Sequence, residues 1–554
     1  MRRYRIRDGL GCTFFNAVIV TSLLLPLGDV LLNVFRDSEG VWEHLAETVL
    51  FRYISNTAIL ALGVVSLTVL IGVTSAWIVT NYEFPGRSIV QWALILPLAI
   101  PSYLLAYAVT DFFKYSGPVQ TMLRKTFQLE RGEYWFPAVR SLPGAVCILS
   151  AGLYPYVYLA CRTALFRLDR NMIESSRTLG AGMVKTFFKV VFPLVSPAVF
   201  AAAMLVLMET LAEFGAVDYC AVDTFATGVY RTWLSHGSLV GAGQLSACLI
   251  LVVVSVLLVK RLTIGNRRVS TNNGASVEVM RRRLGMIGKF LVSLIVWFPV
   301  VMGFIMPVCI FVDMTWKNGD QRAIELLGEL GLNSIQVSIV VATVCTTLSF
   351  LLFSSLRRFP ETFNRIIVGG SGLGYAIPGT VIAIGCLSPF FFLEETIGIW
   401  FLKLNGQDIG VWLTGSIAGL VFGCVCRFAA VSNGMVRSGY DRIPLALDDA
   451  SLALGRGPVK TLYGVHLPLL SSSILIALLM VFVDSMKELP ITLVLRPFNF
   501  DTLAVRVYHL ASDERLDEAA ASALAIIVVG LLPVIVLSKH VFSNAKISSP
   551  GSLK

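Results

Sequence analysis

A series of long apolar runs constrains this chain more than any other feature. A span of about 20 apolar residues crosses the hydrocarbon core of a bilayer, and lipid offers the backbone no hydrogen-bond partners, so each run is expected to be a helix. Only 14% of the 554 residues are charged and 56% are apolar, which argues against a soluble enzyme or a disulfide scaffold. The sequence therefore predicts an all-α polytopic membrane protein with about 12 transmembrane helices. The runs lie near 11–35, 56–80, 88–110, 141–161, 194–217, 239–259, 286–314, 334–356, 366–388, 409–431, 469–486 and 519–538.

The distribution of positive charge predicts the orientation. If both termini are cytoplasmic, about two thirds of the 45 lysines and arginines fall in segments on the cytoplasmic side. The net charge of +10 is then explained by the positive-inside bias, and no nucleic-acid partner is expected. The first run follows Met-Arg-Arg-Tyr-Arg-Ile-Arg, but it is too long for a signal peptide and no Ala-x-Ala site ends it. It is expected to be an uncleaved first span.

The chain contains an internal repeat. Matching residues recur 275 to 278 positions apart, which divides the sequence into a first six-span half (1–261), a basic cytoplasmic linker (262–285) and a second six-span half (286–554). Because six is an even number, the two repeats are expected to be parallel and to enclose a central pathway. The matched pairs include Phe84-Pro85 with Phe359-Pro360, Asn56-Thr57 with Asn333-Ser334, Glu209 with Asp484, Glu213 with Glu488, Asp223-Thr224 with Asp501-Thr502, and Tyr230 with Tyr508.

The strongest repeated motif lies in two long cytoplasmic loops, 162–193 and 437–468. Each contains an acidic residue and two small residues, a glycine six positions after the acid, and a proline thirteen positions after that glycine. The acid and the small residues suit the start of a short helix, and the glycine permits a left-handed turn that ends it. An ordinary interfacial helix-turn-helix is the alternative, but two copies at equal positions favour a shared function.

These loops resemble the EAA loop of ABC importer permeases, as E-S-S…G…V-x-F-P and D-A-S…G…V-x-L-P. The resemblance implies the type I ABC importer permease fold, in which the short helix of each loop docks on a cytoplasmic ATPase. Relative to the family motif, serine replaces alanine, Asp449 replaces glutamate and Phe192 replaces leucine. The docking residues implied by the resemblance are Glu174, Ser175, Ser176, Gly180, Pro193, Asp449, Ala450, Ser451, Gly455 and Pro468.

A narrower resemblance covers most of the chain. Segments 209–217, 222–231, 487–490 and 496–503 are similar to those of fused, double-length ferric-iron importer permeases. This similarity implies a permease in a bacterial inner membrane that receives ferric iron from a periplasmic binding protein and works with two copies of an ATPase. Related permeases carry thiamine, sulfate, polyamines or phosphonates, and these substrates stay open as alternatives.

The chain itself is not expected to be an enzyme. A phosphate-binding loop needs G-x-x-x-x-G-K-[ST], and neither Gly285-Met-Ile-Gly-Lys289 nor Lys460-Thr461 satisfies that spacing. ATP and Mg²⁺ are therefore expected on the separate ATPase, with no cofactor and no resident metal on this chain. A secondary transporter made of two six-span halves is the rival interpretation, but it gives the repeated loops no role.

Four acidic residues are candidates for the pathway. Glu209 and Glu213 are four residues apart, as are Asp484 and Glu488, so each pair is expected to share one helix face. They would either line the outer mouth of the pathway or lie exposed to water at the ends of their spans. Ferric iron prefers oxygen ligands, which carboxylates and Tyr219, Tyr230 or Tyr508 would provide. The loops 111–140 and 487–515 are candidate contacts for the binding protein or interfacial anchors.

Overall fold

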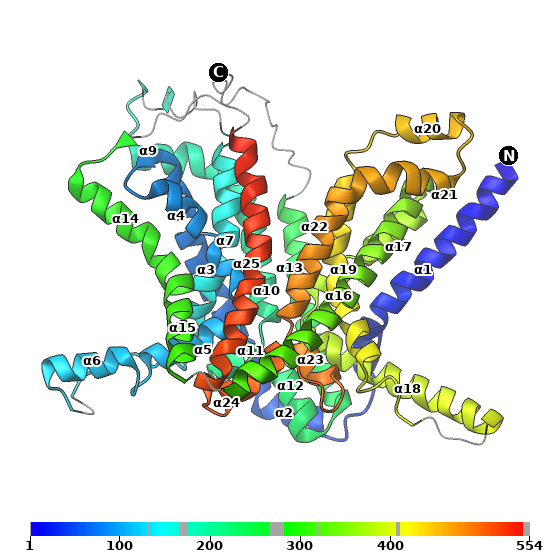
Figure 1. Ribbon diagram of the computed structural model, residues 1–554, viewed down its shortest axis with the longest axis horizontal. Helices are drawn as coiled ribbons and strands as arrows, with labels where there is room; N and C mark the ends of the chain where they lie inside the picture. Colours follow the sequence, from blue (N-terminus) through cyan, green and yellow to red (C-terminus); the bar gives the residue numbers. More distant parts are fainter. Residues whose placement is uncertain are drawn as a thin grey trace. The chain divides into compact units, whose positions relative to one another are not determined.

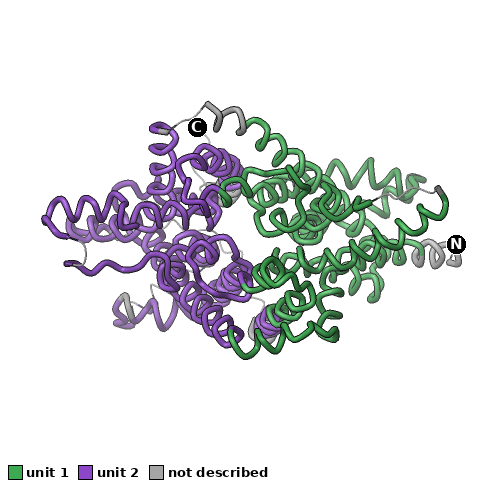
Figure 2. Tube along the Cα trace, turned by 90° about the horizontal axis from the view of Figure 1, so that it is seen from below, with its two compact units in different colours: residues 1–48, 228–250, 321–509 green, residues 49–227, 251–320, 510–554 purple. Residues whose placement is uncertain are grey.

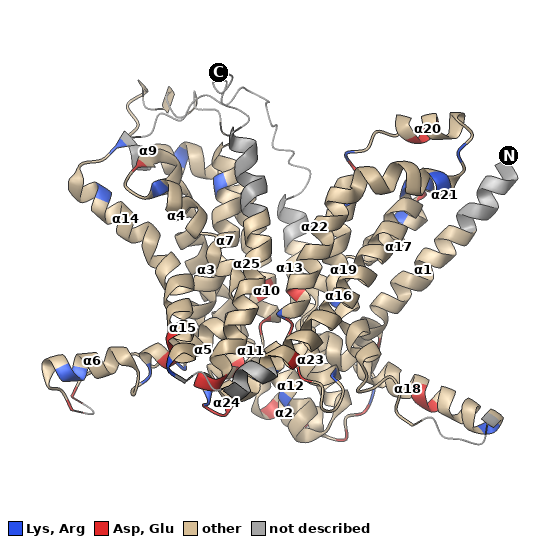
Figure 3. Cartoon of the chain, in the orientation of Figure 1, with Lys and Arg blue, Asp and Glu red and all other residues tan. Residues whose placement is uncertain are grey.

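The computed structural model consists almost entirely of helices (Figure 1). Eleven helices of the described part of the chain are long and apolar enough to cross a membrane, and a bent helix pair raises the number to twelve. The middle lengths of these helices carry few charged residues (Figure 3). The predicted all-α polytopic fold is therefore confirmed. The structure describes residues 2–130, 133–166, 168, 172, 175, 176, 178–264, 282–318, 321–405 and 410–546.

The chain forms two compact units that do not follow chain order (Figure 2). Unit 1 comprises residues 1–48, 228–250 and 321–509, and unit 2 comprises residues 49–227, 251–320 and 510–554. The predicted halves 1–261 and 286–554 thus remain a description of the sequence repeat. Of the predicted linker 262–285, residues 265–281 lie outside the described part of the chain.

Unit 1 contains the second loop. Its helices are α1 (Arg2–Asn33), α2 (Val41–Thr48), α16 (Gln321–Arg358), α17 (Thr362–Gly370), η4 (Gly374–Ala376), α18 (Gly379–Asn405), α19 (Ile417–Tyr440), α20 (Ala446–Ala453), α21 (Pro458–Thr461), η5 (Leu462–His466), α22 (Leu467–Met486) and α23 (Pro490–Leu495). Three helices contribute residues to both units, namely α12 (Phe225–His236), α13 (Leu239–Ile264) and α24 (Leu503–Ser512). The core of unit 1 includes Val20, Phe350, Val436 and Leu470, which come from α1, α16, α19 and α22.

Unit 2 contains the first loop. Its elements are α3 (Leu50–Asn81), β1 (Tyr82–Glu83), α4 (Arg87–Ala93), η1 (Leu96–Ala99), α5 (Ser102–Phe113), α6 (Pro118–Phe127), α7 (Leu142–Phe166), α9 (Met183–Thr186), η2 (Phe187–Val191), α10 (Phe192–Ala212), α11 (Gly215–Tyr219), β2 (Arg282–Arg283), α14 (Met286–Val300), η3 (Val301–Ile305), α15 (Met306–Asn318) and α25 (Leu516–Lys546). The two short strands pair in parallel. Tyr107, Tyr154 and Tyr158 are among the largest fully buried side chains, and they fill the core around α5 and α7.

The first span of the chain packs with helices that are distant in sequence. Helix α1 lies against α17 and α18, and Gly385 of α18 sits directly against the backbone of Pro26. The Asn16 amide also donates to Ser355 Oγ at 2.9 Å and to Asn364 Oδ1 at 2.8 Å. Close backbone approach and interhelical polar contacts are typical of helix packing in lipid, where no hydrophobic force favours one apolar neighbour over another. These contacts explain why residues 1–48 belong to unit 1.

We expect Gly385→Leu to destabilise the protein by about 1–3 kcal/mol, because a side chain at this position overlaps the Pro26 carbonyl and must push α1 away from α18. Thermal unfolding in detergent measures the change. Gly398→Leu is the matched control, since it lies in the same helix and a Cβ there meets no atom within 4 Å. Equal stability of the two variants would contradict the packing of α1 against α18.

Two of the predicted spans are broken. The run at 88–110 forms α4, η1 and α5, and the helical pair Arg87–Ala99 and Ser102–Phe127 bends by 101°. Pro97 and Pro101 cause the break, because proline lacks the amide donor and disfavours helical geometry in the residue before it. The run at 366–388 was expected to be one span, but α17 ends at Gly370 and the span is α18, which starts after Pro378.

The repeat is visible in matched contacts as well as in sequence. The Asn56 amide donates to the Asp223 carbonyl at 2.9 Å, and the Asn333 amide donates to the Asp501 carbonyl at 3.2 Å. Beside them, the Thr57 hydroxyl accepts the amide of Phe225 and the Ser334 hydroxyl accepts that of Leu503. In each unit a polar pair near the start of one span therefore fixes the loop that enters α12 or α24.

Candidate functional site

The second loop forms a short helix with a glycine-terminated end. Helix α20 carries Asp448 and Asp449 in its first turn, where the helix dipole favours negative charge. Gly455 follows the helix with φ of 73°, a left-handed conformation that glycine adopts without steric cost. The Arg456 amide donates to the Ser451 carbonyl and the Gly455 amide to the Leu452 carbonyl, which together form a Schellman cap. The predicted helix and turn are therefore present in this loop.

The first loop has the same turn. Gly180 adopts φ of 80°, and the Ala181 amide donates to the Ser176 carbonyl, as the Arg456 amide does to Ser451. Glu174 lies outside the described part of the chain, so its predicted position is not tested. Ser175 and Gly180 are exposed, as are Asp449, Ala450 and Gly455 in the second loop.

A hydroxyl pair, part-buried in the first loop and buried in the second, joins each loop to the helix that follows. Ser176 Oγ lies 2.9 Å from Thr186 Oγ1, and Ser451 Oγ lies 2.8 Å from Thr461 Oγ1. Ser451 is 4% exposed, so a serine in place of the family's alanine is satisfied internally and does not face solvent. Two of the predicted docking residues, Ser176 and Ser451, are thus placed to hold the loops in shape.

Apolar side chains at matched positions of the two loops are exposed. Leu179 is 87% exposed and Leu454 is 79% exposed, one residue before the left-handed glycine in each loop. Phe188 and Tyr463 form a second exposed matched pair. Exposed apolar groups that recur at equal positions, beside polar residues, are typical of a contact surface for another protein.

The loops join the spans through a wide helical turn. Segments η2 and η5 are single π-helical turns at positions 275 residues apart, directly before α10 and α22. Pro193 and Pro468 lie in the first turns of α10 and α22, where a missing amide donor costs nothing. Both prolines are exposed at the start of a span, as the sequence predicts.

The prediction that the acidic pairs share a helix face is wrong. Helix α10 ends at Ala212 and α22 ends at Met486, so Glu213 and Glu488 lie beyond the helices that carry Glu209 and Asp484. The physical reason is that each second acid caps the next short helix. Glu213 Oε1 accepts the Ala216 amide at 2.9 Å in α11, and Glu488 Oε1 accepts the Ile491 amide at 3.1 Å in α23. Glu209 and Asp484 remain half-buried near the ends of their helices.

Glu488 also forms a buried ion pair. Its two carboxylate oxygens lie 2.9 and 2.7 Å from Arg427 Nη1, and the side chains of Glu488 and Arg427 are 5% and 13% exposed. The alternative of a water-exposed residue therefore does not hold for Glu488. The pair carries no net charge, so Glu488 contributes to the structure of the site and not to an open acidic lining.

The loop 111–140 forms a cleft in unit 2. The cleft has a volume of about 670 Å³, and its lining includes Lys114, Tyr134, Arg140 and Glu514. The guanidinium of Arg140 lies 4.5 Å above the ring of Tyr219 and 3.8 Å from a Glu514 oxygen. Tyr219 is thus covered by a cation, which makes it a poor ligand for Fe³⁺, whereas Tyr508 is buried within unit 1.

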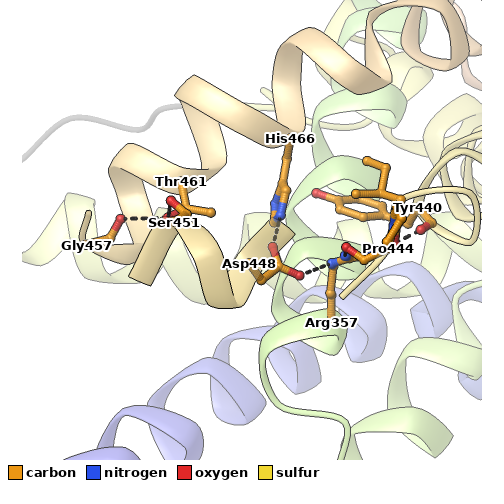
Figure 4. A network of polar contacts seen from close by, with 9 residues as sticks. Arg357, Tyr440, Pro444, Asp448, Ser451, Gly457, Thr461 and His466 are labelled. Carbon is orange, nitrogen blue, oxygen red and sulfur yellow. Dashed lines mark hydrogen bonds and ion pairs between the residues drawn. The ribbon is translucent and has the colours of Figure 1, made fainter. Parts of the chain in front are cut away.

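One polar network was not predicted from the sequence. Arg357, at the end of α16, binds Asp448 of α20, and His466 of η5 binds the same carboxylate (Figure 4). These residues are 91 and 18 positions apart, so no short-range spacing signals their contact. The described residues contain no group of three or more His, Cys, Asp or Glu side chains that could hold a metal ion.

Comparison with known proteins supports the resemblance drawn from the loops. Residues 68–268 match the family described as binding-protein-dependent transport system inner membrane component. The chain is 23% identical to the Fe(3+)-transport system permease protein FbpB 2 of Haemophilus influenzae, over 96% of this chain and 99% of that protein. It is 23% identical to the ferric transport system permease protein FbpB of Actinobacillus pleuropneumoniae, over 93% of this chain and 75% of that protein.

A relative that matches a shorter part of the chain is named for a different substrate. The sulfate transport system permease protein CysT of Escherichia coli is 28% identical over 36% of this chain and 69% of its own length. The resemblance to ABC importer permeases of the double-length ferric type is confirmed. These relatives support the role of a multi-pass inner-membrane permease of an importer, and not that of an enzyme.

Proposed function

We propose that this chain is the permease subunit of an ATP-driven importer of ferric iron, in which one polypeptide supplies both halves of the pathway. The observation that carries the proposal is the pair of loops with one geometry. Each has a left-handed glycine, a hydroxyl pair and an exposed leucine at matched positions. Two such surfaces suit two copies of one ATPase, which supplies the ATP and Mg²⁺ chemistry.

In this mechanism the ATPase pair and the binding protein bind the outward-open and inward-open states of the permease with different affinities, and this difference drives alternating access. ATP-driven closure of the ATPase pair favours an outward-open state, and hydrolysis returns the inward-open state. A loaded periplasmic binding protein docks on the outer side, where the cleft beside Tyr134 and Arg140 is a candidate contact. The binding protein holds the ion tightly, because a pathway conducts only when its own sites bind weakly.

Ferric iron is the first candidate substrate because double-length relatives that match nearly the whole chain carry ferric transport in their names. Half-buried Glu209 and Asp484 are the candidate carboxylates of the pathway, since Glu213 and Glu488 cap helices. Hard oxygen ligands of this kind suit Fe³⁺. Sulfate is the second candidate, favoured by the shorter match; thiamine, polyamines and phosphonates are weaker alternatives.

The experiment captures the partners from native membranes. The tagged chain is cross-linked in cells, purified and analysed for soluble proteins, and the metal content of the captured binding protein is measured. We expect an ABC ATPase and a binding protein that contains iron. An ATPase together with an iron-free, oxyanion-loaded binding protein would contradict the substrate, and the absence of any ATPase would contradict the importer mechanism.

A further inference from the structure

Arg357, at the end of α16, forms four hydrogen bonds with the second loop. Arg357 donates through Nε to Asp448 Oδ2 at 2.6 Å. Its Nη1 donates to the carbonyls of Tyr440 and Ile443 at 3.1 and 3.0 Å, and its Nη2 donates to the carbonyl of Pro444 at 3.1 Å. The side chain of Arg357 is 9% exposed. The planar guanidinium thus holds both the segment that enters α20 and the helix itself, as Figure 4 shows.

Asp448 connects this arginine to a second span. Its Oδ1 lies 2.5 Å from Nε2 of His466, which ends the π-helical turn before α22. The His466 ring is 7% exposed and packs edge-on against Tyr440 at 5.5 Å between centroids. One carboxylate therefore joins α20 to the end of α16 and to the π-helical turn that leads into α22.

The positions of the first half that match this network hold uncharged residues. At the repeat distance of 275 positions, the counterparts of Arg357, Asp448 and His466 are Tyr82, Ile173 and Val191. Tyr82 instead pairs with Arg282 in the short sheet of unit 2. The hydroxyl pair, the left-handed glycine and the exposed leucine recur in both loops, but the three residues of the charged network have uncharged counterparts in the first half of the sequence.

We infer that Asp448, held between Arg357 and His466, is a positioning residue that makes the second docking helix a rigid lever on α16 and α22, so that the two loops transmit ATPase movement unequally. This inference rests on the proposed function, because it assigns the docking helix a mechanical role. Asp449, the neighbouring acid, faces solvent and is left for contact with the partner. The two adjacent carboxylates thus have separate roles, one internal and one at the interface.

Hydrogen exchange tests the rigid attachment without any partner. In the purified chain in lipid nanodiscs, we expect Asp448→Asn to speed amide exchange across 446–453 by at least about tenfold, because local opening no longer breaks the charged contacts. Asp449→Asn is the matched control, with the same chemical change one residue away, and is expected to leave exchange unchanged. Equal exchange in Asp448→Asn and the wild type would overturn the inference.

Coupled transport distinguishes positioning from mere stability. With the ATPase co-purified, we expect Asp448→Asn to keep ATPase binding and hydrolysis while substrate uptake per ATP falls several-fold. Arg357→Lys, which keeps the positive charge, is expected to retain more of this ratio than Arg357→Gln. An unchanged ratio in Asp448→Asn would contradict the inference. If the wild type itself captures no ATPase, the proposed function is wrong. The hydrogen-exchange result still tests separately whether Asp448 holds α20 to α16 and η5.

Discussion

Arginine at both Gly180 and Gly455 is expected to abolish capture of the ATPase while the chain still inserts in the membrane. An added Cβ at either glycine meets no atom within 4 Å, so a side chain has open space where it leaves the backbone. Both positions have positive φ, which costs a non-glycine residue about 1–2 kcal/mol. The bulky cations would stand beside Leu179 and Leu454 on the docking surfaces. We expect recovery of the ATPase with the purified chain to fall at least about tenfold, equivalent to about 1.4 kcal/mol of binding energy.

Asparagine at the same two positions separates surface from backbone effects. Asparagine tolerates the left-handed conformation better than other residues and adds little bulk. The double asparagine variant is therefore expected to capture the ATPase nearly as well as the wild type. If the double asparagine and double arginine variants capture the ATPase equally weakly, the loss is due to the changed turn and not to the surface. If the double arginine variant captures the ATPase normally, neither loop is the docking site.

Removal of the Glu488 carboxylate is expected to destabilise the protein by about 3–5 kcal/mol, because the buried Arg427 would lose the carboxylate that both of its shortest contacts reach. Glu488→Ala also removes the acceptor for the Ile491 amide at the start of α23. The double variant Arg427→Met with Glu488→Met removes both charges of the pair and is expected to recover most of the lost stability. Thermal unfolding in detergent measures both variants. A single variant as stable as the wild type, or a double variant less stable than the single one, would contradict the ion pair.

The spans could be predicted from the sequence because lipid imposes one requirement on every apolar run. The breaks at Pro97, Pro101 and Pro378 were missed, since an average over a window hides one proline among apolar neighbours. The packing of α1 with α17 and α18 was also beyond prediction. Apolar periodicity does not say which neighbour a helix takes when all of its faces are equally apolar.

The two loops were predictable because they are local. A glycine in a left-handed turn and a proline at the start of a span depend on a few adjacent residues, so Gly180 and Gly455 lie as expected. The acidic pairs failed because a spacing of four implies a shared face only within one continuous helix. Glu213 and Glu488 end up as caps of the next helices, which depends on where the preceding helix stops.

The Arg357 network shows the remaining limit. Its members come from α16, α20 and η5, and each looks ordinary in sequence: a basic residue at the end of a span, an acid in a first helical turn and a histidine in a loop. Only the folded chain brings them to one carboxylate. The internal repeat helps afterwards, because it reveals that the counterparts Tyr82, Ile173 and Val191 cannot reproduce the contact.

Uptake into proteoliposomes tests the central claim most directly. The chain is reconstituted with its captured ATPase and binding protein, ATP is supplied on the ATPase side, and radioactive ferric iron is supplied with the binding protein on the other side. Uptake is expected only when ATP, the ATPase and the loaded binding protein are all present. Uptake by the chain alone, driven by an ion gradient without ATP, would contradict the account.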